Sequence, residues 1–134
     1  MGIRVRTITQ KALIPAPPGD VYEAFVDART HSAFTGAKAT GPARVGAKFT
    51  AYDGYIFGVH RALVKGKKIV QAWQTTEWPD GAEPSVVEFS FKPVKRGTEV
   101  RMVHANVPAE QAEAYRQGWI DYYWTPLTSY FQRR

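Results

Sequence analysis

The sequence contains no cysteine, and this absence removes several classes of chemistry. Without thiol groups the chain can form neither a disulfide framework nor a zinc–thiolate site, and it has no thiolate nucleophile. It also lacks an apolar run long enough to cross a membrane, and its first residues contain no apolar core of a secretory signal. These absences predict a cytoplasmic protein without stable membrane insertion.

Internal repeats, low-complexity tracts and linkers are missing as well. A chain of 134 residues, of which 44% are hydrophobic and 13% aromatic, has enough apolar material to bury a core of its own. We therefore expect a single domain that spans residues 1–134.

The formal net charge of +6 leaves several partners open. Positive charge permits attraction to nucleic acid, to an anionic membrane or to an acidic protein. A surface for single-stranded nucleic acid interleaves exposed rings with basic residues, whereas here the basic residues gather in turns and the rings are expected inside. We therefore expect no nucleic-acid partner.

The N-terminal part of the chain predicts one strand and two short helices. Residues 3–14 are extended in character, and the proline-rich stretch at 15–19 ends the strand. A helix then begins at Asp20. A second helix runs from Thr30 to Thr35 and ends at Gly36, because glycine favours the left-handed conformation that closes many helices.

Residues 45–107 predict a meander of antiparallel strands. The dipeptide Asp53-Gly54 tolerates the positive φ angles of a type I′ turn, so it predicts a tight hairpin between Tyr52 and Tyr55. Later strands are separated by turn or loop residues at 65–68, 79–84 and 95–97.

One face of this sheet is predicted to be dry. Apolar and polar residues alternate strictly at 86–92, which is typical of a strand with one buried and one wet side. The same parity continues into the next strand. The residues expected to point inward are Val87, Phe89, Phe91, Val100, Met102 and His104.

The meander also separates charge, because alternate turns of a meander lie at the same end of the sheet. The turns at 65–68 and 92–96 are basic, whereas Glu77, Asp80 and Glu83 gather at the other end. The ordinary interpretation is that these are solvated turn residues, since charge at hairpin tips favours solubility. A basic docking end is the alternative.

A helix rich in aromatic residues is predicted from Glu110 to Phe131, with Pro108 suited to its start. At about 100° per residue, its apolar side chains cover an arc of about 200°. Pro126 has no N–H for the carbonyl of Tyr122, so the helix should kink or break there. The arc consists of Tyr115, Trp119, Tyr122, Tyr123, Pro126 and Tyr130, extended on one side by Ile120, Trp124, Leu127 and Phe131.

Such a wide arc can be covered in two ways. A curved sheet would grip the helix on two sides. Alternatively, a spare edge at Ile120, Trp124 and Phe131 would pack against a second copy, which makes a homodimer plausible, although the same residues also fit under the first strand or the short helices. Tyrosine hydroxyl groups need polar partners in a dry core, whereas a half-wet cavity lets the ring pack while its hydroxyl meets water or a ligand.

Five stretches resemble the C-terminal domain of the activator of the heat shock protein 90 ATPase. They follow the family's order over nearly the whole chain: AFTG at 33–36, VGAKFTAYDGYIFG at 45–58, IVQAWQTTEWP at 69–79, GTEVRMVHANVP at 97–108 and GWIDYYW at 118–124. One departure is Gln74, since the family usually has a basic residue after the tryptophan of that strand.

The resemblance implies an α+β helix-grip (START-like) fold, shared with the birch-pollen-allergen family and polyketide cyclases of the SRPBCC superfamily. In that fold a curved antiparallel sheet wraps around a long C-terminal helix, with two short helices after the first strand. The fold alone does not specify an activity.

Most enzymatic and metal chemistry finds no support in the sequence. His31, His60 and His104 are too scattered for a metal-ligand pair, and no glycine-rich loop leads from a strand to a helix to hold a phosphate, so we expect no metal and no cofactor. His104 is the single candidate catalytic residue, as a proton shuttle aided by a tyrosine. A histidine held by hydrogen bonds inside the sheet is the more ordinary interpretation.

Three functions follow from the sequence. We first expect a non-enzymatic binding domain whose cavity takes a small apolar, aromatic or lipid-like molecule. The alternative is a chaperone-associated protein that docks on a heat shock protein 90-like ATPase or stimulates it, and a minor alternative is a cyclase-like or hydrolytic enzyme. The expected cavity residues are Trp73, Phe89, Met102, His104, Tyr115, Trp119, Tyr122 and Tyr123.

Overall fold

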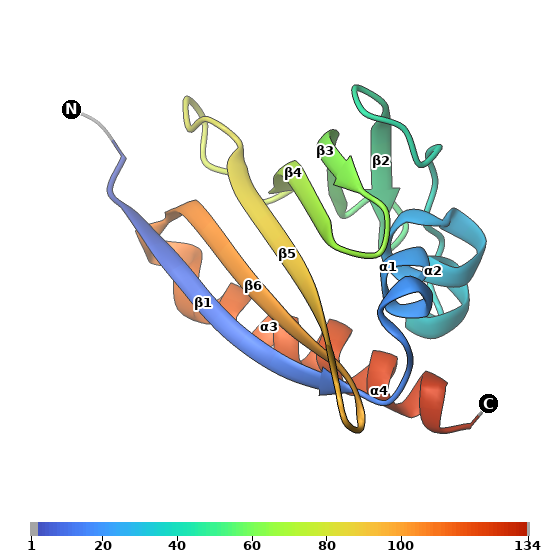
Figure 1. Ribbon diagram of the computed structural model, residues 1–134. Helices are drawn as coiled ribbons and strands as arrows, with labels where there is room; N and C mark the ends of the chain where they lie inside the picture. Colours follow the sequence, from blue (N-terminus) through green and yellow to red (C-terminus); the bar gives the residue numbers. More distant parts are fainter. Residues whose placement is uncertain (1–2, 134) are drawn as a thin grey trace.

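A single curved sheet and one long helical segment organise the protein. The computed structural model describes residues 3–133. Six antiparallel strands lie in the order β1-β6-β5-β4-β3-β2 (Figure 1). Their bounds are β1 Val5–Ile14, β2 Lys48–Ala51, β3 Ile56–Val64, β4 Lys68–Thr75, β5 Ser85–Val94 and β6 Gly97–Pro108.

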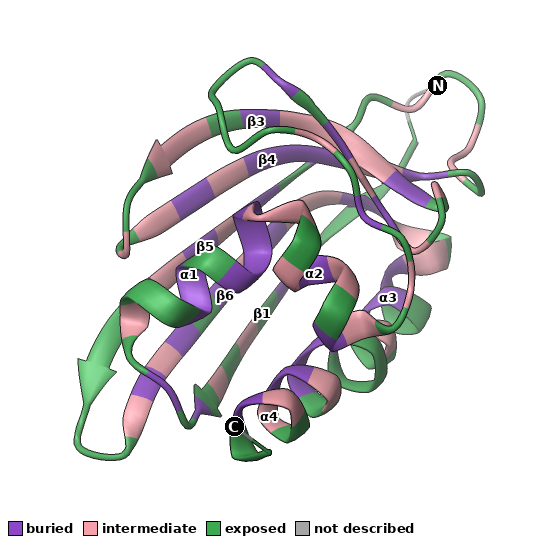
Figure 2. Cartoon of the chain, turned by 90° about the vertical axis from the view of Figure 1, so that its right-hand side faces the viewer, coloured by how far each residue is buried: buried purple, intermediate pink, exposed green. Residues whose placement is uncertain are grey.

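Helices occupy only the concave side of this sheet. Figure 2 shows the strands arching over α1 and α2 and over the C-terminal helix, whose segments are continuous in the chain. The α+β helix-grip prediction is therefore confirmed. The helical bounds are α1 Pro18–Val26, α2 Ala28–Thr35, a 3₁₀ turn Ala109–Gln111, α3 Ala112–Trp119, a π-helical segment Ile120–Trp124 and α4 Thr125–Gln132.

The two short helices begin slightly earlier than the sequence predicts. Helix α1 has Pro18 in its first turn, where the missing N–H costs nothing. Helix α2 starts at Ala28 because the carboxylate of Asp27 caps it, accepting hydrogen bonds from the Thr30 N–H at 3.0 Å and the Thr30 hydroxyl at 2.7 Å. It ends at Gly36 with φ of 75°, as predicted.

The hairpin between β2 and β3 has the predicted turn chemistry. Asp53 and Gly54 both adopt positive φ angles, 59° and 91°, and the N–H of Tyr55 donates to the carbonyl of Tyr52 at 3.1 Å. These are the features of a type I′ turn. The turn matters for function because it holds Tyr52 and Tyr55 above the C-terminal helix.

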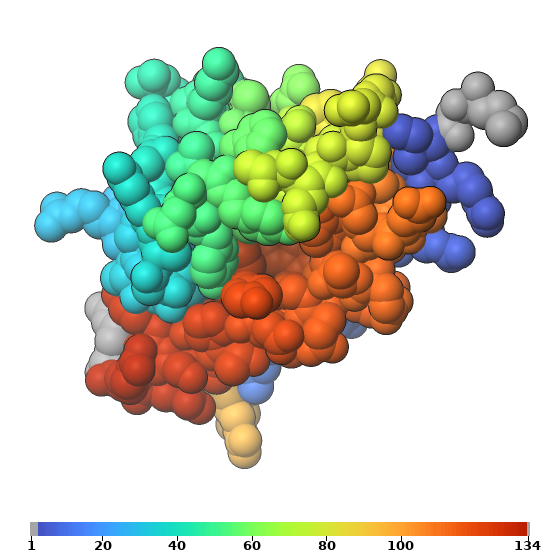
Figure 3. Space-filling view, turned by 180° about the vertical axis from the view of Figure 1, so that it is seen from behind, coloured from blue at the N-terminus to red at the C-terminus, as the bar shows by residue number. Residues whose placement is uncertain are grey.

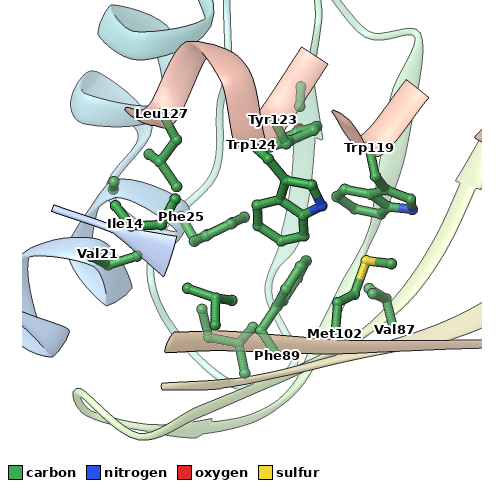
Figure 4. Packing of buried hydrophobic residues seen from close by; sticks show 14 of the residues in the cluster. Ile14, Val21, Phe25, Val87, Phe89, Met102, Trp119, Tyr123, Trp124 and Leu127 are labelled. Atoms are coloured by element: carbon green, nitrogen blue, oxygen red, sulfur yellow. The ribbon is translucent and has the colours of Figure 1, made fainter. Parts of the chain in front are cut away.

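The concave face of the sheet carries the hydrophobic core. All six residues that parity predicts to point inward are buried. Figure 4 shows Trp119 and Trp124 reaching from the C-terminal helix toward Phe89 on the sheet, with Met102 beside them. The centre of the Phe89 ring lies 5.6 Å from that of Trp119 and 4.5 Å from that of Phe25 in α1, so one strand residue joins both helical layers.

The C-terminal helix does not break at Pro126 but widens just before it. In the π-helical segment the N–H of Thr125 donates to the carbonyl of Ile120, five residues back. The hydroxyl of Tyr52 donates to the carbonyl of Tyr122, which Pro126 cannot serve. The predicted interruption is therefore present as a π bulge with an outside hydrogen bond.

The π segment changes which residues face the core. The uniform wheel predicts Tyr122 and Tyr130 in the inward stripe, whereas Tyr122 is 58% exposed and Tyr130 only partly buried. The prediction was wrong here because it assumed a constant 100° per residue. The residues of the helix that are buried are Ala112, Tyr115, Trp119, Tyr123, Trp124, Leu127 and Phe131.

The spare apolar edge predicted for dimerisation is mostly occupied within the chain. Trp124 is buried, with its ring near Phe25, and its indole N–H donates to the side-chain oxygen of Gln10 in β1 at 2.8 Å. Phe131 is buried as well, so only Ile120 of the three remains exposed. The alternative packing, under the first strand and the short helices, is the one observed.

Candidate functional site

A cavity of about 640 Å³ opens between the C-terminal helix and the end of the sheet that contains the β2–β3 turn and the end of β4. Figure 3 shows the surface hollowed between the green residues near position 55 and the orange C-terminal helix. This volume lies within the range of about 300–1,000 Å³ that is typical of small-molecule sites.

Three elements build the walls of the cavity. The β2–β3 turn and the start of β3 supply Tyr52, Tyr55 and Ile56, and the end of β4 with the residues after it supplies Trp73 and Glu77. The helical side begins in the 3₁₀ turn and ends in the π segment. Its lining residues are Glu110, Gln111, Ala114, Tyr115, Gly118, Trp119, Tyr122 and Tyr123.

Stacked and edge-on rings form the floor. The Trp73 ring centre lies 5.6 Å from that of Trp119 and 5.4 Å from that of Tyr115. Trp119 in turn lies 4.9 Å from Tyr123. Trp73, Trp119 and Tyr123 are all at least 96% buried, so the floor is rigid and presents ring faces and edges rather than mobile chains.

The rim is made by less buried tyrosines with polar partners. The hydroxyl of Tyr55 donates to a side-chain oxygen of Glu77, and burial together with this carboxylate raises the pKa of Tyr55 well above its usual value. Tyr52 and Tyr122 form an edge-to-face pair with ring centres 5.6 Å apart. Burial raises the pKa of Tyr52 to about 12. The phenols of Tyr52 and Tyr55 therefore stay neutral near pH 7.

A second set of hydrogen bonds connects the helix to β4 at the edge of the cavity. The hydroxyls of Tyr115 and Thr75 lie 2.7 Å apart, and burial raises the pKa of Tyr115. The amide nitrogen of Gln111 donates to the backbone carbonyl of Glu77 at 2.6 Å. Its side-chain oxygen is buried and has no hydrogen-bond partner among residues 3–133.

His104 lies beneath the floor and is held at both ring nitrogens. Trp119 donates its indole N–H to Nδ1 at 3.1 Å, so the proton of the neutral ring is on Nε2, which lies 2.8 Å from the Ser85 hydroxyl. That hydroxyl donates to the carbonyl of Trp73 at 2.6 Å. Burial lowers the pKa of His104 to about 3. The ordinary interpretation of this histidine matches its contacts, since it is a hydrogen-bonded core residue.

The eight residues expected at a cavity divide into two groups. Trp73, Tyr115, Trp119, Tyr122 and Tyr123 line the cavity. Phe89, Met102 and His104 lie in the core and do not line it. Strand parity predicts which side chains point inward but not how deep the helix lies above them.

Eight lining residues were not predicted: Tyr52, Tyr55, Ile56, Glu77, Glu110, Gln111, Ala114 and Gly118. The sequence indicates the two tyrosines only as flanks of a turn, Glu77 only as loop charge, and Glu110 only as a carboxylate at the start of the helix. The sequence did contain a signal for them, namely their position. Alternate loops of a meander lie at the same end of the sheet, so the β2–β3 turn and the β4–β5 loop lie together, and the C-terminal helix begins at that end too.

The described part of the chain offers no metal cluster and no membrane-spanning helix. Within residues 3–133 there is no group of three potential metal ligands from His, Cys, Asp and Glu. No helix in that range is long and apolar enough to span a membrane. His31 is engaged elsewhere, with Nδ1 at 3.0 Å from the carbonyl of Phe25 and Nε2 at 2.9 Å from the Tyr123 hydroxyl.

Comparison with known proteins identifies the family. The family model described as "Activator of Hsp90 ATPase homolog 1-like protein" matches residues 15–132. The chain belongs to this family. It is 33% identical over 133 residues to the human protein named activator of 90 kDa heat shock protein ATPase homolog 1, a match that covers 98% of this chain and 39% of the relative.

Two solved structures show how this family member relates to others. The crystal structure of an HSP90 activator from Plasmodium falciparum superposes with a TM-score of 0.83 at 27% identity, covering 98% of this chain and 97% of that one. The solution structure of the Aha1 dimer from Colwellia psychrerythraea has a TM-score of 0.74 at 17% identity, covering 87% and 90% of the two chains, and supports the fold alone.

The length of the match limits what can be transferred from larger members of the family. The chain spans between 30% and 39% of the length of the curated relatives it matches. The activity of such a whole protein is therefore a proposal for this chain.

Proposed function

We propose that this chain is a chaperone-associated module of the cytoplasm that docks on an Hsp90-type chaperone and stimulates its ATPase. The observation that carries the proposal is the match to the Plasmodium falciparum protein described as an HSP90 activator, which is nearly complete in both directions. In this function the aromatic rings serve as core and rim, and the contact is made by the surface.

The basic end of the sheet is the surface best suited to such a contact. The turn between β3 and β4 contains Lys65 and Lys67, and the turn between β5 and β6 contains Lys95 and Arg96. Strand order places both turns at the same end, as predicted. Complementary charge raises the rate of association, and added salt reduces that rate again by screening the attraction.

The test is the ATPase rate of a purified Hsp90-type chaperone with and without this chain. We expect stimulation that saturates with concentration. Reversing the charge of Lys67, Lys68, Lys95 and Arg96 should weaken docking at least about tenfold, since several charge pairs of about 0.5 kcal/mol each are lost. A matched control reverses four basic residues on other exposed positions: Lys11, Lys48, Arg61 and Arg101.

Two outcomes would contradict this proposal. Absence of any binding to the chaperone at low salt would remove docking altogether. Equal loss of affinity in the basic-end variant and in the control variant would show that net charge, and not this end of the sheet, controls the contact.

A second candidate function is supported by the cavity itself: a binding site for a small apolar or aromatic molecule. A volume of about 640 Å³ with walls built largely from rings is what such a ligand requires. This function is compatible with docking, because the cavity and the basic turns lie at opposite ends of β4.

Native mass spectrometry of the gently purified protein tests the second candidate. A filled cavity gives a non-covalent mass excess over the denatured chain. Ala114→Trp should abolish that excess, because Ala114 is an exposed helical residue in the cavity wall and its replacement fills the space. Trp119→Ala should do the same by removing part of the floor. A mass excess that persists in both variants would place the ligand elsewhere.

A further inference from the structure

The charge inside the cavity is opposite to that of the protein as a whole. The chain carries a formal net charge of +6, yet the lining residues include Glu77 and Glu110 and no lysine, arginine or histidine. The ion pairs within 4.0 Å among residues 3–133 are Lys68–Glu88 and Arg116–Glu113. Within the described chain, neither lining carboxylate therefore forms an ion pair with a basic side chain.

The walls add a second feature that favours positive charge. More than half of the lining residues are aromatic, and the ring centre of Trp73 lies within 6 Å of those of Trp119 and Tyr115. The face of an aromatic ring attracts a cation, by about 0.5–2 kcal/mol depending on how far the cation is desolvated. An anion gains nothing comparable from ring faces.

The hydrogen-bonding groups of the site point the same way. Four of the five lining tyrosines already use their hydroxyls within the protein: Tyr52 with the Tyr122 carbonyl, Tyr55 with Glu77, Tyr115 with Thr75 and Tyr123 with His31. Gln111 holds its amide nitrogen on the Glu77 carbonyl, which leaves its side-chain oxygen as an acceptor without a donor among residues 3–133.

We infer that the cavity binds small molecules that carry a protonated amine on a flat aromatic or apolar body. The body would lie on the ring floor, and the ammonium group would lie at the rim beside Glu77 and Glu110. The inference rests on the second candidate function and names its ligand class. It excludes fatty acids and other anionic lipids, whose carboxylate or phosphate would meet two carboxylates that form no ion pair, and no cation.

Binding of three matched probes tests the inference. Naphthylethylamine, naphthylethanol and naphthylpropionate share one ring system and tether and differ in the charge of the end group. Titration calorimetry at low salt should give the order amine, alcohol, carboxylate, with about tenfold between amine and carboxylate from the combined ring and carboxylate attraction. Added salt should weaken the amine and strengthen the carboxylate.

Variants then assign the preference to named residues. Glu77→Gln combined with Glu110→Gln should lower the affinity for the amine toward that of the alcohol, with only the ring attraction left, while the affinity for the alcohol stays unchanged. The matched control is Glu113→Gln, which removes a carboxylate from the same helix that does not line the cavity. Ala114→Trp should abolish binding of all three probes and so locates them.

The outcomes separate this inference from the function on which it rests. If no probe binds saturably, the small-molecule function fails as well. If the probes bind with equal affinity, or the carboxylate binds best, the cavity holds ligands but the charge preference is overturned. If the glutamine variant fails to fold, the order of the three probes on the unaltered protein still decides.

Discussion

His104 shows how a single residue ties the core to the cavity floor. The chain of hydrogen bonds from Trp119 through His104 and Ser85 holds the Trp119 indole and the backbone carbonyl of Trp73 from below, and the His104 ring centre lies 4.7 Å from that of Trp73. Because Nδ1 accepts a hydrogen bond from Trp119, the ring cannot be protonated without breaking this contact. The floor is therefore held in place by a neutral histidine.

Protonation of His104 should make the protein acid-labile. Its folded pKa of about 3 lies below the unfolded value near 6.5. Between these values the unfolded chain binds a proton that the folded chain does not, so the free energy of unfolding decreases as pH falls, by up to about 1.4 kcal/mol per pH unit. His31 and His60, whose pKa values burial also lowers, act in the same direction.

Denaturant unfolding at a series of pH values checks this prediction. His104→Gln should reduce the dependence on pH below about 6.5, because glutamine does not titrate but can still accept from Trp119 and donate to Ser85. The variant's constant cost, about 1–3 kcal/mol from imperfect packing and hydrogen bonding, is measured near neutral pH and subtracted. An unchanged slope would mean that His104 is protonated in the folded protein.

At the scale of the element, the π segment determines which residues of the C-terminal helix face the sheet. Residues 115, 119, 123, 127 and 131 are buried at a strict spacing of four. On a regular α-helix this spacing drifts by about 40° per step, and a wider π turn takes up part of the drift. The same adjustment turns Tyr122 outward to the rim.

The hydrogen bond from Tyr52 to Tyr122 should be coupled to Pro126. Tyr52→Phe leaves the Tyr122 carbonyl without its donor and should cost about 0.5–1.5 kcal/mol of stability. In a Pro126→Ala background the new N–H can serve that carbonyl, so the cost of Tyr52→Phe should shrink. A double-mutant cycle by thermal or denaturant unfolding measures the difference. Equal costs in both backgrounds would contradict the coupling.

Elements that have a local cause in the sequence could be predicted from it. The sheet was therefore predicted more completely than the candidate site. The hairpin follows from Asp53-Gly54, and the inward set of β5 and β6 follows from a period of two. The carbonyl of Tyr122 in the π segment is paired with the hydroxyl of Tyr52, 70 residues away in the chain. No local pattern contains that contact, so the phase of the helix and the rim of the cavity were missed.

At the scale of the whole molecule, two surfaces with different charges lie at opposite ends of the sheet. The basic turns before β4 and after β5 lie at one end of the sheet, and the cavity mouth with Glu77 and Glu110 lies toward the other. Proposals about a partner and about a ligand therefore concern different surfaces. Variants of one surface should leave the other function intact, which makes the two separable by experiment.

The basic turns at one end of the sheet and the carboxylates at the cavity mouth contribute an electric dipole along the strands. A molecule with such a dipole does not approach a charged body in random orientation, because the field exerts a torque on it before contact. Facing an anionic surface, the protein would turn its lysine-rich turns forward and carry the cavity mouth on the trailing side, open to the solvent. Delivery of a small cation to that mouth would then continue while the protein is held.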